Sequence, residues 1–192
     1  VQAAVAVLRG AGLRALSLDV LYGLPHQSEA DARRTAALVA ALKPDRVAAF
    51  GYAHVPWFKA RQRLIDEAAL PDTETRMAQA AAMRQALLAA GYVEIGFDHY
   101  AAPMDPLAVA ARTGGLTRSF QGYGIDDAEV LIGLGASAIS TYPQGYAQNL
   151  AEPGAYARAV ADTGLATARG IALTADDRTR RAIINQLLCA FE

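Results

Sequence analysis

Strand-like and helix-like segments alternate along the N-terminal half of the chain, and this order constrains the fold more than any other feature. Residues 15–20 alternate in polarity, as expected of a half-buried strand. Ser28 and Asp31 then have the spacing of a capping box, which predicts a helix to about Leu42. Residues 46–52 form a second, more continuously apolar strand. Such βαβ units build either an open parallel sheet or a barrel.

The same pattern continues less regularly further along the chain. Asp72 or Thr73 opens a helix that stops at Gly91. Val93, Ile95 and Phe97 alternate as a third strand. The remaining elements that we expect are a short helix at 126–134, a short strand at 136–140 and, from about Tyr146, helices only. We therefore predict an α/β domain at residues 1–145 and the beginning of a helical domain at residues 146–192.

Polar and ionisable residues follow each of the three predicted strands. Asp19 ends the first strand, Tyr52 and His54 the second, and Asp98 and His99 the third. Ligands bind at the C-terminal ends of strands in both open α/β sheets and barrels. The sequence therefore predicts a site at this end of the sheet.

The same residues also have structural interpretations. His54, or Asp98 with His99, could ligate a metal, but three scattered histidines lack the spacing of a known metal site, and strand-end polar groups satisfied by hydrogen bonds are the simpler explanation. Asp19 could bind a ligand, or be a buried carboxylate that hydrogen-bonds to its own turn. There is no GxGxxG or P-loop motif to suggest a nucleotide-phosphate site.

Composition excludes several functional classes. The net charge of −1, without runs of like charge, argues against nucleic-acid binding, and no apolar run is long enough to span a membrane. The first residues lack the charged, apolar and small-residue sections of a signal peptide, so we expect a cytoplasmic protein. The single cysteine, Cys189, cannot form an internal disulfide or a multi-cysteine metal site. The uncapped start and the apolar end lead us to expect a chain truncated at both ends.

Several longer segments resemble one enzyme family. Residues 19–27 (DVLYGLPHQ) resemble the DLIYGLPxQ segment of the oxygen-independent coproporphyrinogen III oxidases and of the related haem chaperones. Residues 50–57, 96–101 and 118–123 are similar to the oxidases' FxYAHxPW, GMDHFA and RNFQGY segments. The resemblance continues through the segments at 135–140, 147–149 and 171–181, so it covers essentially the whole chain.

The resemblance implies a fold and a chemistry. The fold would be the C-terminal part of a partial (β/α)6 radical S-adenosylmethionine barrel, followed by the start of a helical C-terminal domain. Members of this family use a [4Fe–4S] cluster and S-adenosylmethionine to decarboxylate two propionates of coproporphyrinogen III to vinyl groups. The three cluster cysteines lie in the family's N-terminal half, which this chain lacks, so the isolated chain is expected to be inactive.

The resemblance also assigns residues and partners. Asp19, Ala53 and Ile139 match positions that contact S-adenosylmethionine. Tyr52, His54, Asp98, His99 and Gln121 are candidates for the cofactor or substrate pocket, and no catalytic residue is assigned. The implied partners are coproporphyrinogen III and an electron-donor protein, with a monomer as the expected state and neither nucleic acid nor membrane involved.

Two other functions remain possible from the sequence. A haem chaperone of the same fold would bind haem without decarboxylation, but the segments around His54, His99 and Gln121 resemble the oxidases more closely. A metal-independent hydrolase using His54 or His99 as a base lacks a nucleophile motif such as GxSxG.

Overall fold

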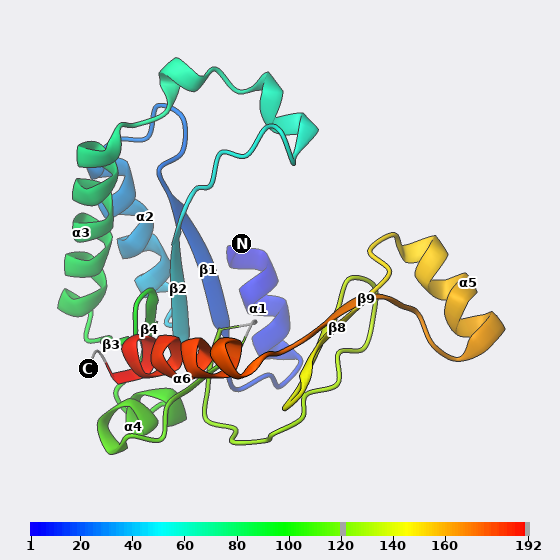
Figure 1. Cartoon of the computed structure of the whole chain (residues 1–192). Helices are drawn as coiled ribbons and strands as arrows, with labels where there is room; N and C mark the ends of the chain where they lie inside the picture. Colours follow the sequence, from blue (N-terminus) through cyan, green and yellow to red (C-terminus); the bar gives the residue numbers. More distant parts are fainter. Residues whose placement is uncertain (120–121, 191–192) are drawn as a thin grey trace. The chain divides into compact units, whose positions relative to one another are not determined.

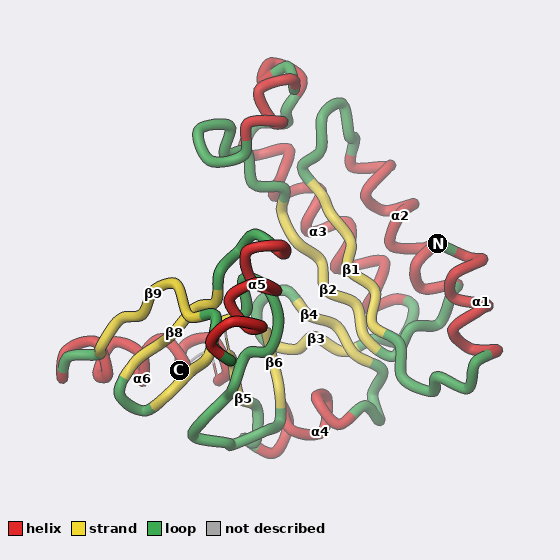
Figure 2. Tube along the Cα trace, turned by 90° about the vertical axis from the view of Figure 1, so that its right-hand side faces the viewer, coloured by secondary structure: helices red, strands yellow, loops and turns green. Residues whose placement is uncertain are grey.

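Two parallel strands, β1 (Ser17–Tyr22) and β2 (Arg46–Gly51), pair along one side of the first sheet in the computed structural model. The structure describes residues 1–119 and 122–190. The chain divides into two compact units, Val1–Gly115 and Leu116–Glu192. In the first unit the strand order is β1-β2-β4-β3, which can be followed in Figure 2.

Two helices pack on one face of this sheet (Figure 1). Helix α2 (Glu29–Ala41) begins with the predicted capping box, in which Ser28 and Asp31 each bond to the other's backbone N–H. Helix α3 (Thr73–Ala89) begins at the predicted cap, Asp72, which accepts a hydrogen bond from the backbone N–H of Thr75. The predictions of both helices and of strands β1 and β2 are confirmed.

The core of the first unit lies between this sheet face and the two helices. It combines alanine and valine side chains, which let the helices approach the strands closely, with larger leucine, methionine and tyrosine side chains. The buried members of this core are Val20, Ala32, Ala36, Val39, Val47, Ala49, Met83, Leu87, Tyr92 and Tyr100.

Tyr100 makes the core sensitive to alkaline pH. Burial raises the pKa of its phenol to about 12, from an ordinary value of 10. The phenol ionises more readily in the unfolded chain than in the folded chain. Below pH 10 it is neutral in both states and does not reduce the free energy of unfolding, which then falls as the pH rises towards 12. By pH 12 we expect this single group to have cost about 2 kcal/mol of unfolding free energy.

Tyr100→Phe should remove this part of the alkaline destabilisation. Urea unfolding at pH 8 and at pH 11.5 measures it, since the unfolding free energy of the variant should fall less between the two pH values than that of the natural chain. Equal losses in both proteins would contradict the assignment.

The predicted third strand is only partly correct. Strand β3 (Val93–Ile95) ends earlier than expected, and the chain turns back at Gly96, whose φ is +58°, into β4 (His99–Ala101). Strand β4 pairs antiparallel with both β3 and β2. Asp98 and His99 therefore do not end a parallel strand: Asp98 lies in a turn and His99 begins β4. Phe97, predicted to belong to the third strand, lies in the turn and is 75% exposed.

The other elements of the first unit surround this sheet. Helix α1 (Gln2–Gly10) precedes β1 in the chain. The connection between β2 and α3 contains the short 3-10 helices η1 (Ala60–Leu64) and η2 (Glu67–Ala69). Helix α4 (Pro106–Thr113) is capped by Asp105, whose buried carboxylate also accepts two 3.0 Å hydrogen bonds from Arg46 Nε.

The second unit departs further from the prediction. It contains an antiparallel pair, β5 (Thr117–Ser119) with β6 (Gly122–Gly124), and a three-stranded antiparallel sheet. The strands of this sheet and the two helices are β7 (Ile139–Tyr142), β8 (Gly145–Asn149), α5 (Pro153–Thr163), β9 (Thr167–Ala172) and α6 (Ala175–Ala190).

Two predictions for this unit are wrong. No helix forms at residues 126–134, and the region after Tyr146 is not purely helical, because β8 and β9 form there. The short fourth strand exists but begins at Ile139. The predicted domain boundary between residues 145 and 146 stays a prediction. No helix in the described part of the chain is both long enough and apolar enough to cross a membrane.

Candidate functional site

Asp19 and His99 lie on the face of the first sheet that α2 and α3 do not cover. Leu18 and Val20 pack towards the helices, so Asp19, between them, points to the opposite face. Asp19 is in register with Ala48 on β2, and Ala48 is in register with His99 on β4. The two predicted residues are therefore in one row across the sheet, with one strand between them.

Asp19 is exposed, and its carboxylate makes no hydrogen bond to the residues that the structure describes. The interpretation of Asp19 as a buried carboxylate that stabilises its own turn is therefore wrong. The side chain is available to accept hydrogen bonds from a bound molecule.

Asp98 and His99 form a second polar group beside this row. His99 Nδ1 lies 2.6 Å from Asp98 Oδ1, and the ring of Phe50 meets the His99 ring edge-on, with 5.9 Å between centroids. Both polar side chains are largely buried. The carboxylate fixes the orientation of the imidazole ring.

Tyr52 and His54 follow β2, at the strand end that the sequence indicated. The Tyr52 hydroxyl lies 3.3 Å from His54 Nδ1, and His54 Nε2 lies 3.1 Å from Glu67 Oε1 in η2. The His54 side chain is 15% exposed, whereas that of Glu67 is 71% exposed. A chain of groups able to exchange protons thus connects solvent with the Tyr52 hydroxyl.

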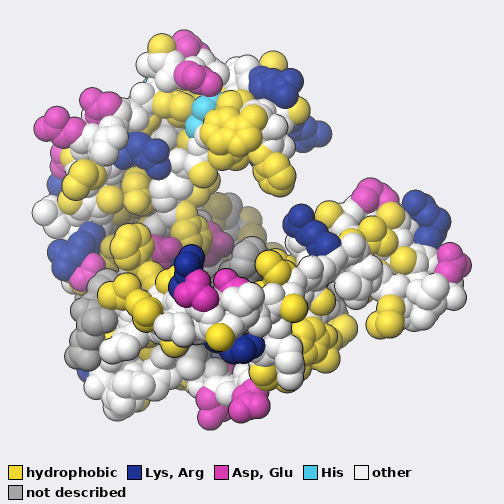
Figure 3. Space-filling view, viewed as in Figure 1, with side chains coloured by type: hydrophobic (Ala, Val, Ile, Leu, Met, Phe, Trp, Pro, Cys, Tyr) yellow, Lys and Arg dark blue, Asp and Glu magenta, His cyan; other side chains and the backbone are white. Residues whose placement is uncertain are grey.

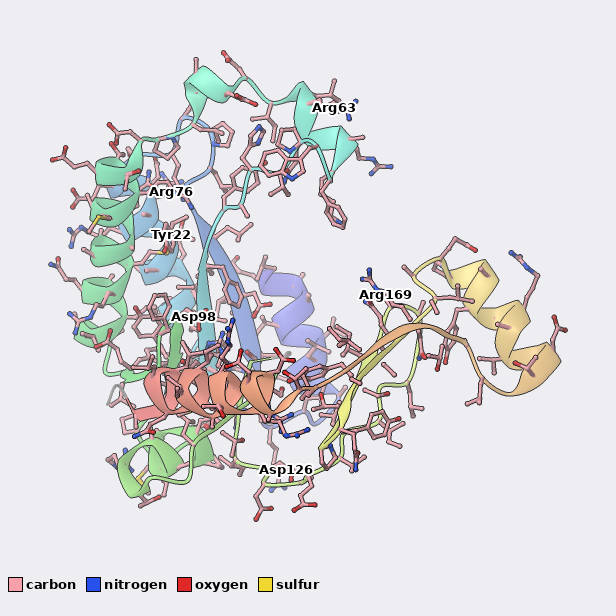
Figure 4. All side chains as sticks on the ribbon, viewed as in Figure 1. Tyr22, Arg63, Arg76, Asp98, Asp126 and Arg169 are labelled. Atoms are coloured by element: carbon pink, nitrogen blue, oxygen red, sulfur yellow. The ribbon has the colours of Figure 1, made fainter. Side chains whose placement is uncertain are left out.

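Arg76 of α3 fixes the backbone at the ends of β1 and β2. Its guanidinium donates a 2.9 Å hydrogen bond to the Tyr52 carbonyl oxygen. A Cβ at Gly23 or at Gly51 would come within 3.1 or 3.0 Å of this guanidinium. Figure 4 shows Arg76 beside Tyr22 at this end of the strands. Both glycines therefore make room for the arginine.

Gln79, one helical turn further along α3, holds the loop after β1. It is fully buried, accepts a 2.9 Å hydrogen bond from Gly23 N–H, and donates one to the Gln27 carbonyl oxygen. Gly23 has a φ of +81°, which its lack of a side chain permits. Arg76 and Gln79 together set the conformation of both strand-end loops.

Sequence reasoning did not identify Glu67, Arg76 or Gln79. A signal for Gln79 exists, because it falls on the apolar stripe of α3 with Met83 and Leu87, where a polar residue needs a buried partner. No comparable pattern distinguishes Glu67, which lies in an irregular connection.

The remaining predicted residues are less informative. Ala53 is exposed just beyond β2, and its carbonyl oxygen accepts a 3.0 Å hydrogen bond from Gln62 Nε2. Ile139 begins β7 in the second unit, in register with Gln148 on β8. Gln121 lies outside the described residues.

A pocket near these loops lies on the wrong side of the sheet for this site. Its cavity of about 230 Å³ is lined by Tyr22, Thr73, Arg76, Met77 and Ala80, all on the side of α3. Asp19 points to the opposite face, so this pocket does not belong with the row of Asp19 and His99.

The described residues do not fit an iron–sulfur cluster. The chain has one cysteine, Cys189, and its described part contains no group of three His, Cys, Asp or Glu residues able to hold a metal. The donor set does suit S-adenosylmethionine, because the exposed carboxylate of Asp19 can accept hydrogen bonds and offset positive charge.

The structure is similar to a radical S-adenosylmethionine enzyme. Coproporphyrinogen III oxidase (HemN) from Escherichia coli, described as a radical SAM enzyme, matches with a TM-score of 0.89 and 42% sequence identity. The match covers 99% of this chain and 44% of that one. The mixed α/β fold therefore has the same arrangement as part of that enzyme.

Curated relatives lead to the same family. An oxygen-independent coproporphyrinogen III oxidase of Bradyrhizobium diazoefficiens is 51% identical over 98% of this chain, and one of Paracoccus denitrificans is 49% identical over 98%. The chain spans 42% of the length of each of these relatives. No family model matches it. The resemblance seen in the motifs is confirmed: homologues of this chain are oxygen-independent coproporphyrinogen III oxidases, and the chain corresponds to their C-terminal portion.

Proposed function

We propose that this chain supplies the C-terminal portion of an oxygen-independent coproporphyrinogen III oxidase. Its substrate would be coproporphyrinogen III, two of whose propionate side chains lose carbon dioxide and become vinyl groups. The observation that carries the proposal is 51% identity to such an oxidase over 98% of the chain. The haem chaperone alternative is not favoured, since the homologues are named as oxidases.

The architecture that best supports this function is part of a partial (β/α)6 barrel. In such a barrel the face of β1 and β2 that carries Asp19 would line the interior, opposite α2 and α3. This proposal accounts for a sheet with helices on only one face.

The residues of the chain would bind and orient, and the cofactor would supply the radical chemistry. S-adenosylmethionine, when bound next to a [4Fe–4S] cluster, provides the oxidising power that side chains lack. Asp19, Ala53 and Ile139 would hold S-adenosylmethionine. Arg76 and Gln79 would keep the strand-end loops in place around it.

Tyr52, His54, Asp98 and His99 would form the polar part of the pocket. The paired Asp98 and His99, and the chain from Tyr52 to Glu67, hold their side chains in fixed orientations, which a pocket for a charged substrate requires. An electron-donor protein, a cytoplasmic location and a monomeric enzyme complete the proposal.

A chimera tests the function directly. This chain replaces the matching segment of the Bradyrhizobium diazoefficiens oxidase, and the purified protein is assayed anaerobically with reductant and S-adenosylmethionine. We expect protoporphyrinogen IX to form. A chimera that has its cluster, judged by visible absorption, and yet gives no product would refute the proposal. The chain alone, with its single cysteine, should give no turnover.

Asp19→Asn in the same chimera tests the assigned role of the carboxylate. The substitution removes a charged acceptor, so we expect S-adenosylmethionine to bind at least about tenfold more weakly, as for the loss of a charge-assisted hydrogen bond. Equilibrium dialysis with labelled S-adenosylmethionine measures the affinity. Asp162→Asn, at an exposed carboxylate on α5, is the matched control. An unchanged affinity in the Asp19 variant would remove Asp19 from the site.

A further inference from the structure

The connection between β2 and α3 exposes several large apolar side chains. Trp57 is 78% exposed, Phe58 76% and Leu64 89%. Figure 3 shows hydrophobic side chains gathered over this connection, at the top of the molecule, next to Lys and Arg side chains. Exposed aromatic groups in contiguous patches mark binding surfaces more often than scattered apolar residues do. We refer to Trp57–Leu64 as the docking segment.

The docking segment is also strongly basic. It contains Lys59, Arg61 and Arg63, all exposed, and no acidic residue. Lys59 Nζ lies 5.0 Å from the centre of the Phe58 ring, so charge and aromatic surface are in contact. Arg63, labelled in Figure 4, donates a hydrogen bond to the Pro56 carbonyl oxygen. The surface therefore suits a ligand that is both apolar and anionic.

Hydrogen bonds hold the docking segment in a definite conformation. The Gln62 side chain accepts a 2.6 Å bond from Val55 N–H and donates a 3.0 Å bond to the Ala53 carbonyl oxygen. The backbone N–H groups of Phe58 and Lys59 both donate to the Val55 carbonyl oxygen. The exposed aromatic groups are thus presented by an ordered turn, which lowers the entropic cost of binding.

The docking segment also adjoins the candidate site. Its conformation is linked through Gln62 to Ala53, which matches a position that contacts S-adenosylmethionine in the resembling family. His54 lies between Ala53 and the turn. A ligand bound on the segment would therefore be next to Ala53 and His54, two of the candidate site residues.

We propose that the docking segment binds the tetrapyrrole substrate, with the Trp57 and Phe58 rings against the macrocycle and Lys59, Arg61 and Arg63 pairing with its propionates. The inference rests on the proposed function, which supplies a ligand with four carboxylates on an apolar ring. An acidic electron-donor protein is the other possible occupant of a basic surface. The substrate fits better because the segment adjoins Ala53, which matches a position that contacts S-adenosylmethionine. An electron-donor protein must instead reach the [4Fe–4S] cluster, whose ligands this chain does not carry.

Fluorescence of the chain provides the test, because Trp57 is its only tryptophan. The chain is titrated with coproporphyrin III, the stable oxidised form of the substrate, and binding is followed by Trp57 quenching and by the porphyrin absorption. We expect saturable binding that weakens with salt, and much weaker binding of the uncharged tetramethyl ester.

Variants separate the docking segment from non-specific attraction. Arg61→Glu with Arg63→Glu should weaken binding by about tenfold, the product of two exposed ion pairs. Trp57→Ala, followed by porphyrin absorption, should weaken it by about fivefold through lost aromatic contact. Arg14→Glu with Arg34→Glu changes the net charge equally at exposed arginines elsewhere in the same unit, and should leave binding unchanged.

Three outcomes would overturn the inference. The first is an equal affinity of the Arg61/Arg63 and Arg14/Arg34 double variants for coproporphyrin III, and the second is an equal affinity of the natural chain for coproporphyrin III and for its tetramethyl ester. The third is that variants in the docking segment bind coproporphyrin III normally but no longer bind a small acidic redox protein. If the chimera turns over substrate but the docking-segment variants keep their porphyrin affinity, the proposed function stands and the docking segment is rejected as the binding surface. If porphyrin binding depends on the docking segment but the chimera shows no turnover, the binding surface stands and the proposed function is rejected.

Discussion

Replacing Gln79 with alanine is expected to destabilise the first unit by about 3 kcal/mol. Gln79 is fully buried and satisfies two backbone groups, Gly23 N–H and the Gln27 carbonyl oxygen. Without it, each group loses its partner in a region that water reaches poorly, at a cost of about 1–3 kcal/mol per group. Urea unfolding followed by circular dichroism measures the change, and hydrogen exchange at the Gly23 amide should become faster.

Gln62→Ala is the matched control. Gln62 makes the same pair of bonds, from one backbone N–H and to one carbonyl oxygen, but it is only partly buried, and its carbonyl partner, on Ala53, is exposed. Water can replace these bonds, so we expect a loss of less than about 1 kcal/mol. Similar losses at Gln62 and Gln79 would show that burial does not decide the effect.

Gly145→Ala is expected to disrupt the three-stranded sheet of the second unit. A Cβ at Gly145 would fall on the Ile171 carbonyl oxygen of β9, well inside van der Waals contact, and would also crowd the Ala172 Cα at 3.2 Å. Backbone atoms paired in a sheet cannot move aside without breaking the pairing. We expect a loss of at least about 3 kcal/mol, the upper range for overpacked sites. Urea unfolding and hydrogen exchange of the β8 and β9 amides would detect it.

Gly154→Ala controls for the added methyl group in the same unit. A Cβ there meets only side-chain atoms, the Glu152 carboxylate that caps α5 and the end of Arg158, and no backbone of a paired strand. At most the cap is disturbed, so we expect a loss of no more than about 1 kcal/mol. If Gly145→Ala unfolds at the same urea concentration as the natural chain, the close approach of β8 and β9 is contradicted.

Local sequence signals were sufficient where an element is specified by its own residues. The capping box of Ser28 and Asp31 and the cap at Asp72 fix helix starts through bonds within one turn. The β3–β4 turn was missed because alternation through Val93, Ile95 and Phe97 is the same whether the chain continues or reverses at Gly96. The reversal becomes evident only when β4 pairs with β2.

The strands of the second unit were also harder to predict, because they too depend on pairing between separate segments. All residues of β9 are exposed, so the segment has no apolar alternation that would distinguish it from a loop or a helix. Its strand conformation comes from pairing with β8, which is far away in sequence. At the candidate site, Tyr52 and His54 could be predicted from the end of β2, whereas Asp19 was wrongly placed at the end of the first strand and lies within β1. The partners of Tyr52 and His54 come from α3 and η2 and required the tertiary structure.

The packing of Gly23 and Gly51 against Arg76 has an evolutionary consequence. These glycines belong to two different motif segments, at residues 19–27 and 50–57, and both face the same guanidinium. The three positions therefore form one steric unit, in which a larger residue at either glycine requires a smaller one at 76. Among homologues, substitutions at these three positions should therefore occur together. The glycines of the two motif segments are then required by an arginine in α3, a helix that belongs to neither segment.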